Sequence, residues 1–144
     1  MKTQEYVFNL LWVDDDVELL EPLRWTLEYH GFMVRTVASY AEALVLLAGG
    51  EKFDGLLTDV IIPYGPDRGS LEPNLGLSLA EYAAARGVGA VAFLTVVPLS
   101  EVQEKYEAVK AKHPLVKLNY YNKLFLLEPF TIESLMESLK PRRS

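Results

Sequence analysis

The chain has 144 residues, 50% of them hydrophobic, and a formal net charge of −6. This length suits one domain with its own hydrophobic core, and an acidic chain lacks the basic surface that non-specific nucleic-acid binding requires. The absence of cysteine excludes disulfides, thiolate metal sites and cysteine nucleophiles. No apolar stretch approaches the roughly 18 residues of a membrane span, and the polar start is too short for a signal peptide. We therefore expect a soluble, cytoplasmic protein.

The first predicted strand covers residues 6–13 and runs directly into three acids. Its apolar end is typical of a strand that is buried on both faces. Asp14, Asp15 and Asp16 cannot share that burial, because an unpaired carboxylate is costly to remove from water. The strand must therefore end at a surface where the acids begin. Asp16 is expected to cap the following helix, which the apolar spacing predicts as far as residue 30.

Strands and helices alternate along the rest of the chain. Further strands are predicted at residues 32–37, 53–58, 90–94 and 115–121, and further helices at residues 40–48, 77–86, 99–112 and 131–139. Ser39 and Glu42 have the spacing of a capping box at the start of one helix. Residues 60–74 form a long loop that is rich in proline and glycine, and loops of this length are usually functional or mobile.

This alternation predicts a five-stranded parallel sheet with helices on both faces, an α/β architecture joined by right-handed crossovers. All strands of a parallel sheet point the same way, so the residues that end them meet at one edge. The predicted strands end at Asp14 and Asp15, at Asp59 and at Thr95. Ligands of open α/β sheets bind beyond this carboxyl edge. Topology alone therefore brings three carboxylates and a hydroxyl together.

Carboxylates at close quarters repel one another and favour a hard divalent cation. Mg²⁺ suits such a group, because it binds one or two carboxylates, keeps several waters and completes its shell with phosphate oxygens. An aspartate beside the metal can act as a nucleophile toward phosphorus. A lysine and a hydroxyl would then neutralise charge on the group being transferred.

These residues resemble the receiver domain of two-component response regulators, over nearly the whole chain. The segments that carry the resemblance are Leu11-Trp12-Val13-Asp14-Asp15, Thr58-Asp59-Val60-Ile61-Ile62-Pro63 and Phe93-Leu94-Thr95. The resemblance implies a flavodoxin-like (βα)5 fold. It also implies that Asp59 accepts a phosphoryl group from a histidine kinase or phosphotransfer protein. By the same resemblance Asp15, Asp59 and the backbone carbonyl of Ile61 bind Mg²⁺, Asp14 acts largely through water, and Thr95 binds the phosphoryl group.

The family follows its last strand with a lysine and a proline, and this chain departs from that pattern. One alignment places Lys123 at the lysine position, which makes Tyr120 the aromatic that moves inward on phosphorylation. The competing alignment uses Glu128 before Pro129, which makes Phe125 that aromatic. We favour Lys123, because Glu128 would add a carboxylate where the phosphoryl group needs a cation.

Two further departures lie near the expected site. The loop after Asp59 is longer than is typical of the family, so Gly76 is taken as the glycine before the third helix, and Pro63 as the loop proline. Val96 follows Thr95 where the family prefers a small residue. Away from the site, Trp12 and Trp25 are expected to be buried or half-buried, and Tyr106 to lie on a helix surface.

The leading hypothesis is a stand-alone receiver domain over residues 1–144, without an output domain, acting as a monomer or dimer. It would be a signalling domain rather than an enzyme and would signal by phosphorylation-dependent partner binding or phosphorelay, without direct nucleic-acid or membrane binding. The alternative is a pseudo-receiver that binds partners independently of phosphorylation. A phosphatase of similar topology is disfavoured, because Ile61 rather than a second acid stands two residues after Asp59.

Overall fold

The computed structural model describes residues 7–16, 20–65, 74–125 and 128–141. Five parallel strands form one sheet in the order β2-β1-β3-β4-β5, and helices alternate with them along the chain. The strands are β1 (Phe8–Val13), β2 (Phe32–Val37), β3 (Gly55–Thr58), β4 (Ala90–Thr95) and β5 (Lys117–Asn122). The helices are α1 (Glu21–Tyr29), α2 (Tyr40–Ala48), α3 (Leu75–Ala85), α4 (Leu99–Lys112) and α5 (Pro129–Ser138). This architecture confirms the predicted fold class.

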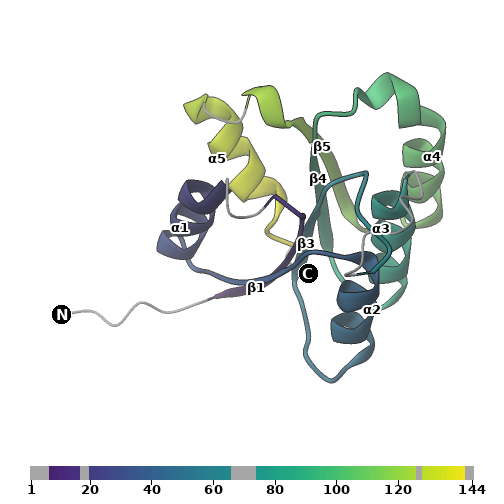
Figure 1. The fold of residues 1–144 in the computed structure, drawn as a ribbon, viewed down its shortest axis with the longest axis horizontal. Coiled ribbons are helices and arrows are strands. Elements are labelled where there is room, and N and C mark those ends of the chain that lie inside the picture. The colour runs from purple at the N-terminus through teal and green to yellow at the C-terminus, as the bar shows by residue number, and fades with distance from the viewer. Residues whose placement is uncertain (1–6, 17–19, 66–73, 126–127, 142–144) are drawn as a thin grey trace.

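The helices form two layers that sandwich the sheet. In Figure 1, α1 and α5 cover one face, and α2, α3 and α4 cover the other. Side chains that alternate along each strand feed the two halves of the core: Leu10 and Trp12 pack toward the first layer, and Leu11 and Val13 toward the second. β3 and β4 are buried along their whole length. The polar residues of this region therefore lie at the ends of these strands.

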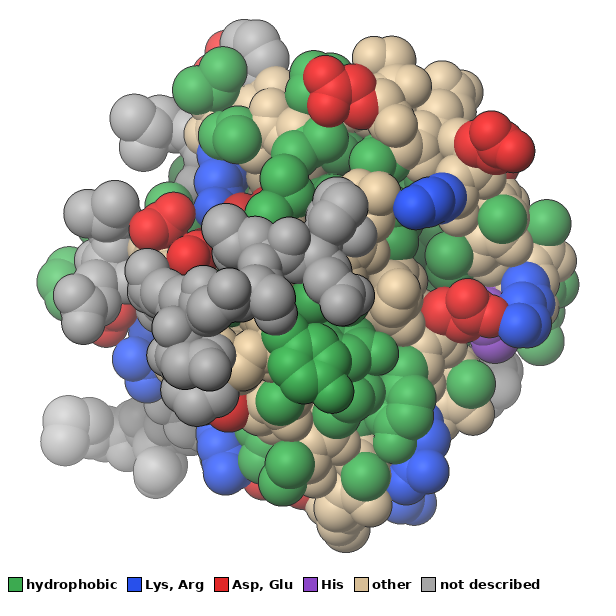
Figure 2. All heavy atoms as spheres, turned by 45° about the vertical axis from the view of Figure 1, so that its right-hand side comes forward, with side chains coloured by type: hydrophobic (Ala, Val, Ile, Leu, Met, Phe, Trp, Pro, Cys, Tyr) green, Lys and Arg blue, Asp and Glu red, His purple; other side chains and the backbone are tan. Residues whose placement is uncertain are grey.

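The face formed by α2, α3 and α4 mixes all kinds of side chain. Figure 2 shows hydrophobic side chains gathered near the middle of this face, with acidic and basic ones interspersed around them. Among the described residues, no helix is long and apolar enough to cross a bilayer.

Helix boundaries follow local backbone chemistry. The N-cap half of the predicted capping box is present at α2, where the Ser39 hydroxyl accepts the Glu42 N–H at 3.3 Å, and the same hydroxyl donates to the Glu42 carboxylate at 2.8 Å. At the end of α3, Gly87 has a φ of +98°, and the N–H groups of Gly87 and Val88 turn back to the Ala84 and Ala83 carbonyls. This is the glycine-ended Schellman arrangement. It directs the chain straight into β4.

Three sequence-based expectations are wrong. Asp16 does not cap α1, because the helix begins at Glu21 with Leu20 as its N-cap and Pro22 in its first turn, where proline is well tolerated. Trp25 is 62% exposed on the outer face of α1, whereas Trp12 is fully buried as expected. Tyr106 is only 7% exposed, because α4 turns the face that carries it toward β4 and β5.

Candidate functional site

The sheet register places the acids and the lysine side by side. Val13 pairs with Thr58 across β1 and β3, and Thr95 pairs with Asn122 across β4 and β5. Asp14, Asp59 and Lys123 are the residues that immediately follow β1, β3 and β5. They therefore leave the sheet together at its carboxyl edge. The Asp59 N–H donates to the Val13 carbonyl at 3.1 Å, which continues the β1–β3 ladder into the site.

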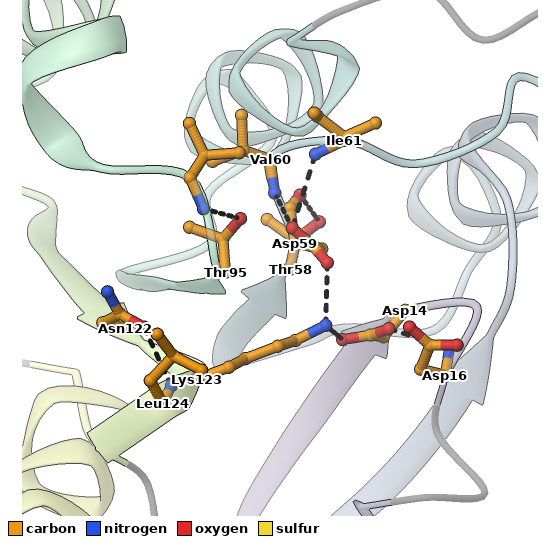
Figure 3. Close-up of polar contacts among 11 residues, drawn as sticks. Asp14, Asp16, Thr58, Asp59, Val60, Ile61, Thr95, Asn122, Lys123 and Leu124 are labelled. Atoms are coloured by element: carbon orange, nitrogen blue, oxygen red, sulfur yellow. Dashed lines mark hydrogen bonds and ion pairs between the residues drawn. The ribbon is translucent and has the colours of Figure 1, made fainter.

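Lys123 joins the two acids. Its Nζ lies 2.8 Å from Asp14 Oδ2 and 2.8 Å from Asp59 Oδ2 (Figure 3). The Lys123 side chain is 14% exposed, and those of Asp14 and Asp59 are 0% and 12% exposed. A buried carboxylate needs a compensating charge, and this ammonium supplies it to both acids. Two ionised carboxylates and one ammonium leave one negative charge at the site.

Burial and charge pairing both act on this group of residues. Burial raises the pKa of the Asp14 carboxyl above its ordinary value, although the Lys123 ammonium and the Asp16 N–H oppose that effect. Burial lowers the pKa of the Lys123 ammonium, but its hydrogen bonds to Asp14 and Asp59 outweigh burial and leave that pKa raised. Lys123 is therefore a permanent cation at neutral pH.

The backbone around Asp59 is held closely. Asp59 Oδ1 accepts the Val60 N–H at 2.7 Å and the Ile61 N–H at 3.4 Å, so one carboxylate oxygen faces backbone donors and the other faces Lys123. Gly76, in the first turn of α3, packs directly on this segment, and its N–H donates to the Val60 carbonyl at 2.9 Å. A Cβ on Gly76 would lie 2.0 Å from the Asp59 carbonyl oxygen. Only glycine allows this approach.

Three adjacent acids form a carboxylate cluster beside Lys123. Single oxygens of Asp14, Asp15 and Asp16 lie within 4.8 Å of one another, a spacing that can hold a cation. The Asp16 N–H also donates to Asp14 Oδ1 at 2.8 Å, which fixes the turn. Sequence reasoning gave Asp16 only a capping role, whereas the structure places one of its carboxylate oxygens near those of Asp14 and Asp15.

A hydrogen-bonded path leads from Thr95 to the aromatic cluster of β4, α4 and β5. The buried Thr95 Oγ1 accepts the Val97 N–H at 3.2 Å, and the Val97 carbonyl accepts the Tyr120 hydroxyl at 2.6 Å. The Tyr120 ring also contacts the rings of Phe93 and Tyr106 at centroid distances of 5.8 Å. The side chain of Val96, between Thr95 and Val97, is 58% exposed.

The other predicted residues lie around this centre. Glu128 is exposed at the N-cap of α5, whereas Lys123 contacts both acids. The Phe125 backbone belongs to the short 3-10 helix η2 (Lys123–Phe125), but its side chain lies outside the described part of the structure. Pro63 is buried, and its carbonyl accepts the Tyr40 N–H at 2.9 Å, which ties the loop to α2. Residues 66–73 of that loop lie outside the described residues.

Comparison with known proteins identifies the fold. Neither a protein-family model nor a curated protein matches the sequence. Among solved structures, a CheY-like response regulator receiver domain from Methanospirillum hungatei is similar, with a TM-score of 0.65, 22% identity and coverage of 90% of this chain and 88% of that chain. The non-phosphorylated HemR receiver domain from Leptospira biflexa has a TM-score of 0.65 and 23% identity, with 94% and 98% covered.

A third similar structure carries ligands. It is a response regulator from Burkholderia pseudomallei with a phosphorylated aspartic acid, a calcium ion and citrate, with a TM-score of 0.64 and 24% identity, covering 92% of this chain and 66% of that chain. The chain therefore has the fold of response regulator receiver domains, and the resemblance noted in the sequence extends to the whole sheet and its helices.

Proposed function

We propose that this chain is a response regulator receiver that accepts a phosphoryl group on Asp59 in a Mg²⁺-dependent reaction. The observation that carries the proposal is the placement of Lys123, 2.8 Å from both Asp14 and Asp59 at the carboxyl edge of the sheet. This edge is where parallel α/β sheets bind ligands. An acid, a paired lysine and a neighbouring carboxylate cluster make up the charges that phosphoryl transfer to an aspartate requires.

The donor set fits a hard divalent cation. Asp14, Asp15 and Asp16 present carboxylate oxygens within 4.8 Å of one another, and the site keeps an excess negative charge after Lys123 is counted. Oxygen ligands of this kind suit Mg²⁺. Asp15, Asp59 and the Ile61 carbonyl would hold the ion directly, with Asp14 acting through water. When bound, the ion supplies positive charge that offsets the oxygens of the phosphoryl group.

The residues of the chain have distinct tasks in the proposed reaction. One Asp59 carboxylate oxygen attacks the phosphorus of a phosphohistidine, so that an O–P bond forms while the N–P bond breaks and the imidazole leaves. The Lys123 ammonium moves its contact from a carboxylate oxygen to a phosphoryl oxygen, and Thr95 offers its hydroxyl to another. The backbone N–H groups of Val60 and Ile61 keep Asp59 oriented while this happens.

Signalling would follow from a shift between two arrangements of the same fold. Thr95 is linked through Val97 to Tyr120, so a new bond at Thr95 bears on the aromatic cluster and on α4. We propose that a histidine kinase or phosphotransfer protein is the donor, and that a downstream protein reads the result in the cytoplasm. The domain would signal by phosphorylation-dependent binding or by phosphorelay.

A thermal-shift experiment with a phosphoryl analogue tests this function. Mg²⁺ with beryllofluoride should raise the melting temperature, because a ligand at 100 times its dissociation constant stabilises the folded state by about 2.7 kcal/mol. Asp59→Asn should abolish the shift. Asp54→Asn is the matched control, because Asp54 precedes β3 where Asp59 follows it, and it should keep the shift. An unchanged melting temperature in the parent protein would favour the pseudo-receiver alternative.

A further inference from the structure

Lys123 begins a turn that is fixed by a neighbouring side chain. Asn122 is the last residue of β5, and its Oδ1 accepts the Leu124 N–H at 2.8 Å (Figure 3). This is an Asx turn, in which a short side chain reproduces a backbone turn. It spans Lys123, which lies between the donor and the acceptor, and it opens the 3-10 helix η2. The direction in which Lys123 leaves the sheet is therefore set by Asn122.

The turn helps to set the position of the Lys123 ammonium, because the flexible lysine side chain cannot fix that position by itself. A lysine side chain is flexible and carries about 2 kcal/mol of rotamer entropy. Its Nζ can stand between two buried carboxylates only if the backbone starts from the right place. Up to Asn122, the backbone position is fixed by the pairing of β4 with β5, in which Asn122 pairs with Thr95. β5 ends at Asn122, so the 3-10 helix η2 that follows it is not held by strand pairing.

The residue after Lys123 supplies the donor of this turn. A proline at this point would fix its own φ and carry no N–H. Leu124 instead has no ring that fixes its φ, and it keeps an N–H that can donate. Asn122 Oδ1 supplies that acceptor, and it restricts the turn by the same hydrogen bond.

We infer that Asn122 is a positioning residue that holds Lys123 between Asp14 and Asp59, and this inference rests on the proposed function. Asn122 acts through Lys123 and has no described bond to either acid. Loss of its acceptor should let the Lys123 backbone rotate, so that the ammonium spends less time at the site. The acids, the fold and the metal ligands would stay in place.

Four single variants and one double variant test the inference with a small phosphodonor, acetyl phosphate, in the presence of Mg²⁺. Asn122→Ala should slow phosphorylation about fivefold, the effect of losing one ordinary hydrogen bond. Asn122→Ser should restore most of the rate, because a serine hydroxyl can accept the same N–H in a turn. Asn119→Ala is the matched control: Asn119 lies on β5 beside Lys117 and Tyr121, which face α5, and its loss should leave the rate unchanged. The Lys123→Gln variant should already be phosphorylated slowly, and adding Asn122→Ala to it should not lower the rate further.

Amide hydrogen exchange at Leu124, read by ¹⁵N NMR, follows the turn itself. Exchange should speed up in Asn122→Ala and stay slow in Asn122→Ser. The inference would be overturned if Asn122→Ala were phosphorylated at the rate of the parent protein. It would also be overturned if Asn122→Ala caused the same fivefold loss in the Lys123→Gln background. If the parent protein takes up no phosphoryl group, the proposed function is wrong. The positioning role is then decided by a double-mutant cycle of unfolding free energy for Asn122→Ala and Lys123→Gln, where zero coupling overturns it.

Discussion

Lys123 is the residue on which the charge balance of the site depends. Among the described residues, Lys123 is the cation that contacts Asp14 and Asp59, and both carboxylates are largely removed from water. Two carboxylates left together without it would repel each other and lose the hydrogen bonds that stabilise their charged forms. The lysine therefore contributes to stability and, in the proposed reaction, also to phosphoryl binding.

Truncation of this lysine separates the two alignments that the sequence left open. Lys123→Ala should lower the rate of phosphorylation by acetyl phosphate about 100-fold, as the loss of one preorganised charge donor does in other active sites. It should also destabilise the fold by about 1–3 kcal/mol in urea denaturation, since the pair is largely buried. Glu128→Ala should do neither, because Glu128 is exposed at the start of α5. The reverse pattern would assign the position to Glu128.

Two tyrosines of the aromatic cluster make stability depend on alkaline pH. Burial raises the pKa of Tyr106 to about 12 and that of Tyr120 to about 12. In the unfolded chain a tyrosine ionises near pH 10. A raised folded pKa means that the stability contribution is complete below about pH 10 and is lost as the pH rises toward 12.

Removing one of these hydroxyls should reduce the loss of unfolding free energy at alkaline pH. Tyr106→Phe should reduce the fall in unfolding free energy between pH 9 and pH 11, taken here as roughly the window around the tyrosine pKa. The measurement is urea denaturation at a series of pH values. Tyr29→Phe is the control, because Tyr29 is 79% exposed and should leave the slope unchanged. Equal slopes in the parent protein and Tyr106→Phe would contradict the assignment.

At the scale of elements, the junction between β3 and α3 holds Asp59 in place. Gly76 lets the first turn of α3 rest on the backbone of Asp59 and Val60, where an added Cβ would lie 2.0 Å and 2.8 Å from backbone atoms. Backbone cannot move aside as a flexible side chain can. The helix and the strand end are therefore coupled at this one residue.

A single methyl group tests that coupling. Gly76→Ala should destabilise the protein by about 3 kcal/mol or more, beyond the usual range for overpacking, because the helix must shift away from the strand. It should also weaken the beryllofluoride-induced thermal shift, since Asp59 moves with its backbone. Gly50→Ala is the control: nothing lies within 4 Å of its added Cβ. Similar melting temperatures for the two variants would show that α3 and β3 are not closely packed.

Element prediction succeeded where periodicity and capping agreed. The boundaries of β2 and α4 were predicted to the residue, and α2 was predicted from its capping box. The start of α1 was wrong, because Asp16 is a good capping residue while the proline signal at Pro22 marked the true first turn. Tyr106 was read as surface, although Val102 and Val109 on the same helical face are buried with it.

At the scale of the whole molecule, parallel topology explains how much of the site the sequence could predict. Asp14, Asp59 and Thr95 were predicted because each ends or directly follows a strand, and all strand ends of a parallel sheet meet at one edge. Charge favoured Lys123 over Glu128 in the sequence, but the choice depends on where β5 stops, which the structure shows to be Asn122. The Asx turn at Asn122 was out of reach, because it appears only once the turn itself is known.

One covalent change, at Asp59, is expected. Incubation with Mg²⁺ and acetyl phosphate, followed by intact-mass and peptide mass spectrometry, should show a single phosphoryl group on Asp59. Asp59→Asn should remove it, whereas Asp54→Asn should keep it. An unchanged mass of the parent protein, or a phosphoryl group that maps to another residue, would contradict the assignment of Asp59 as the acceptor.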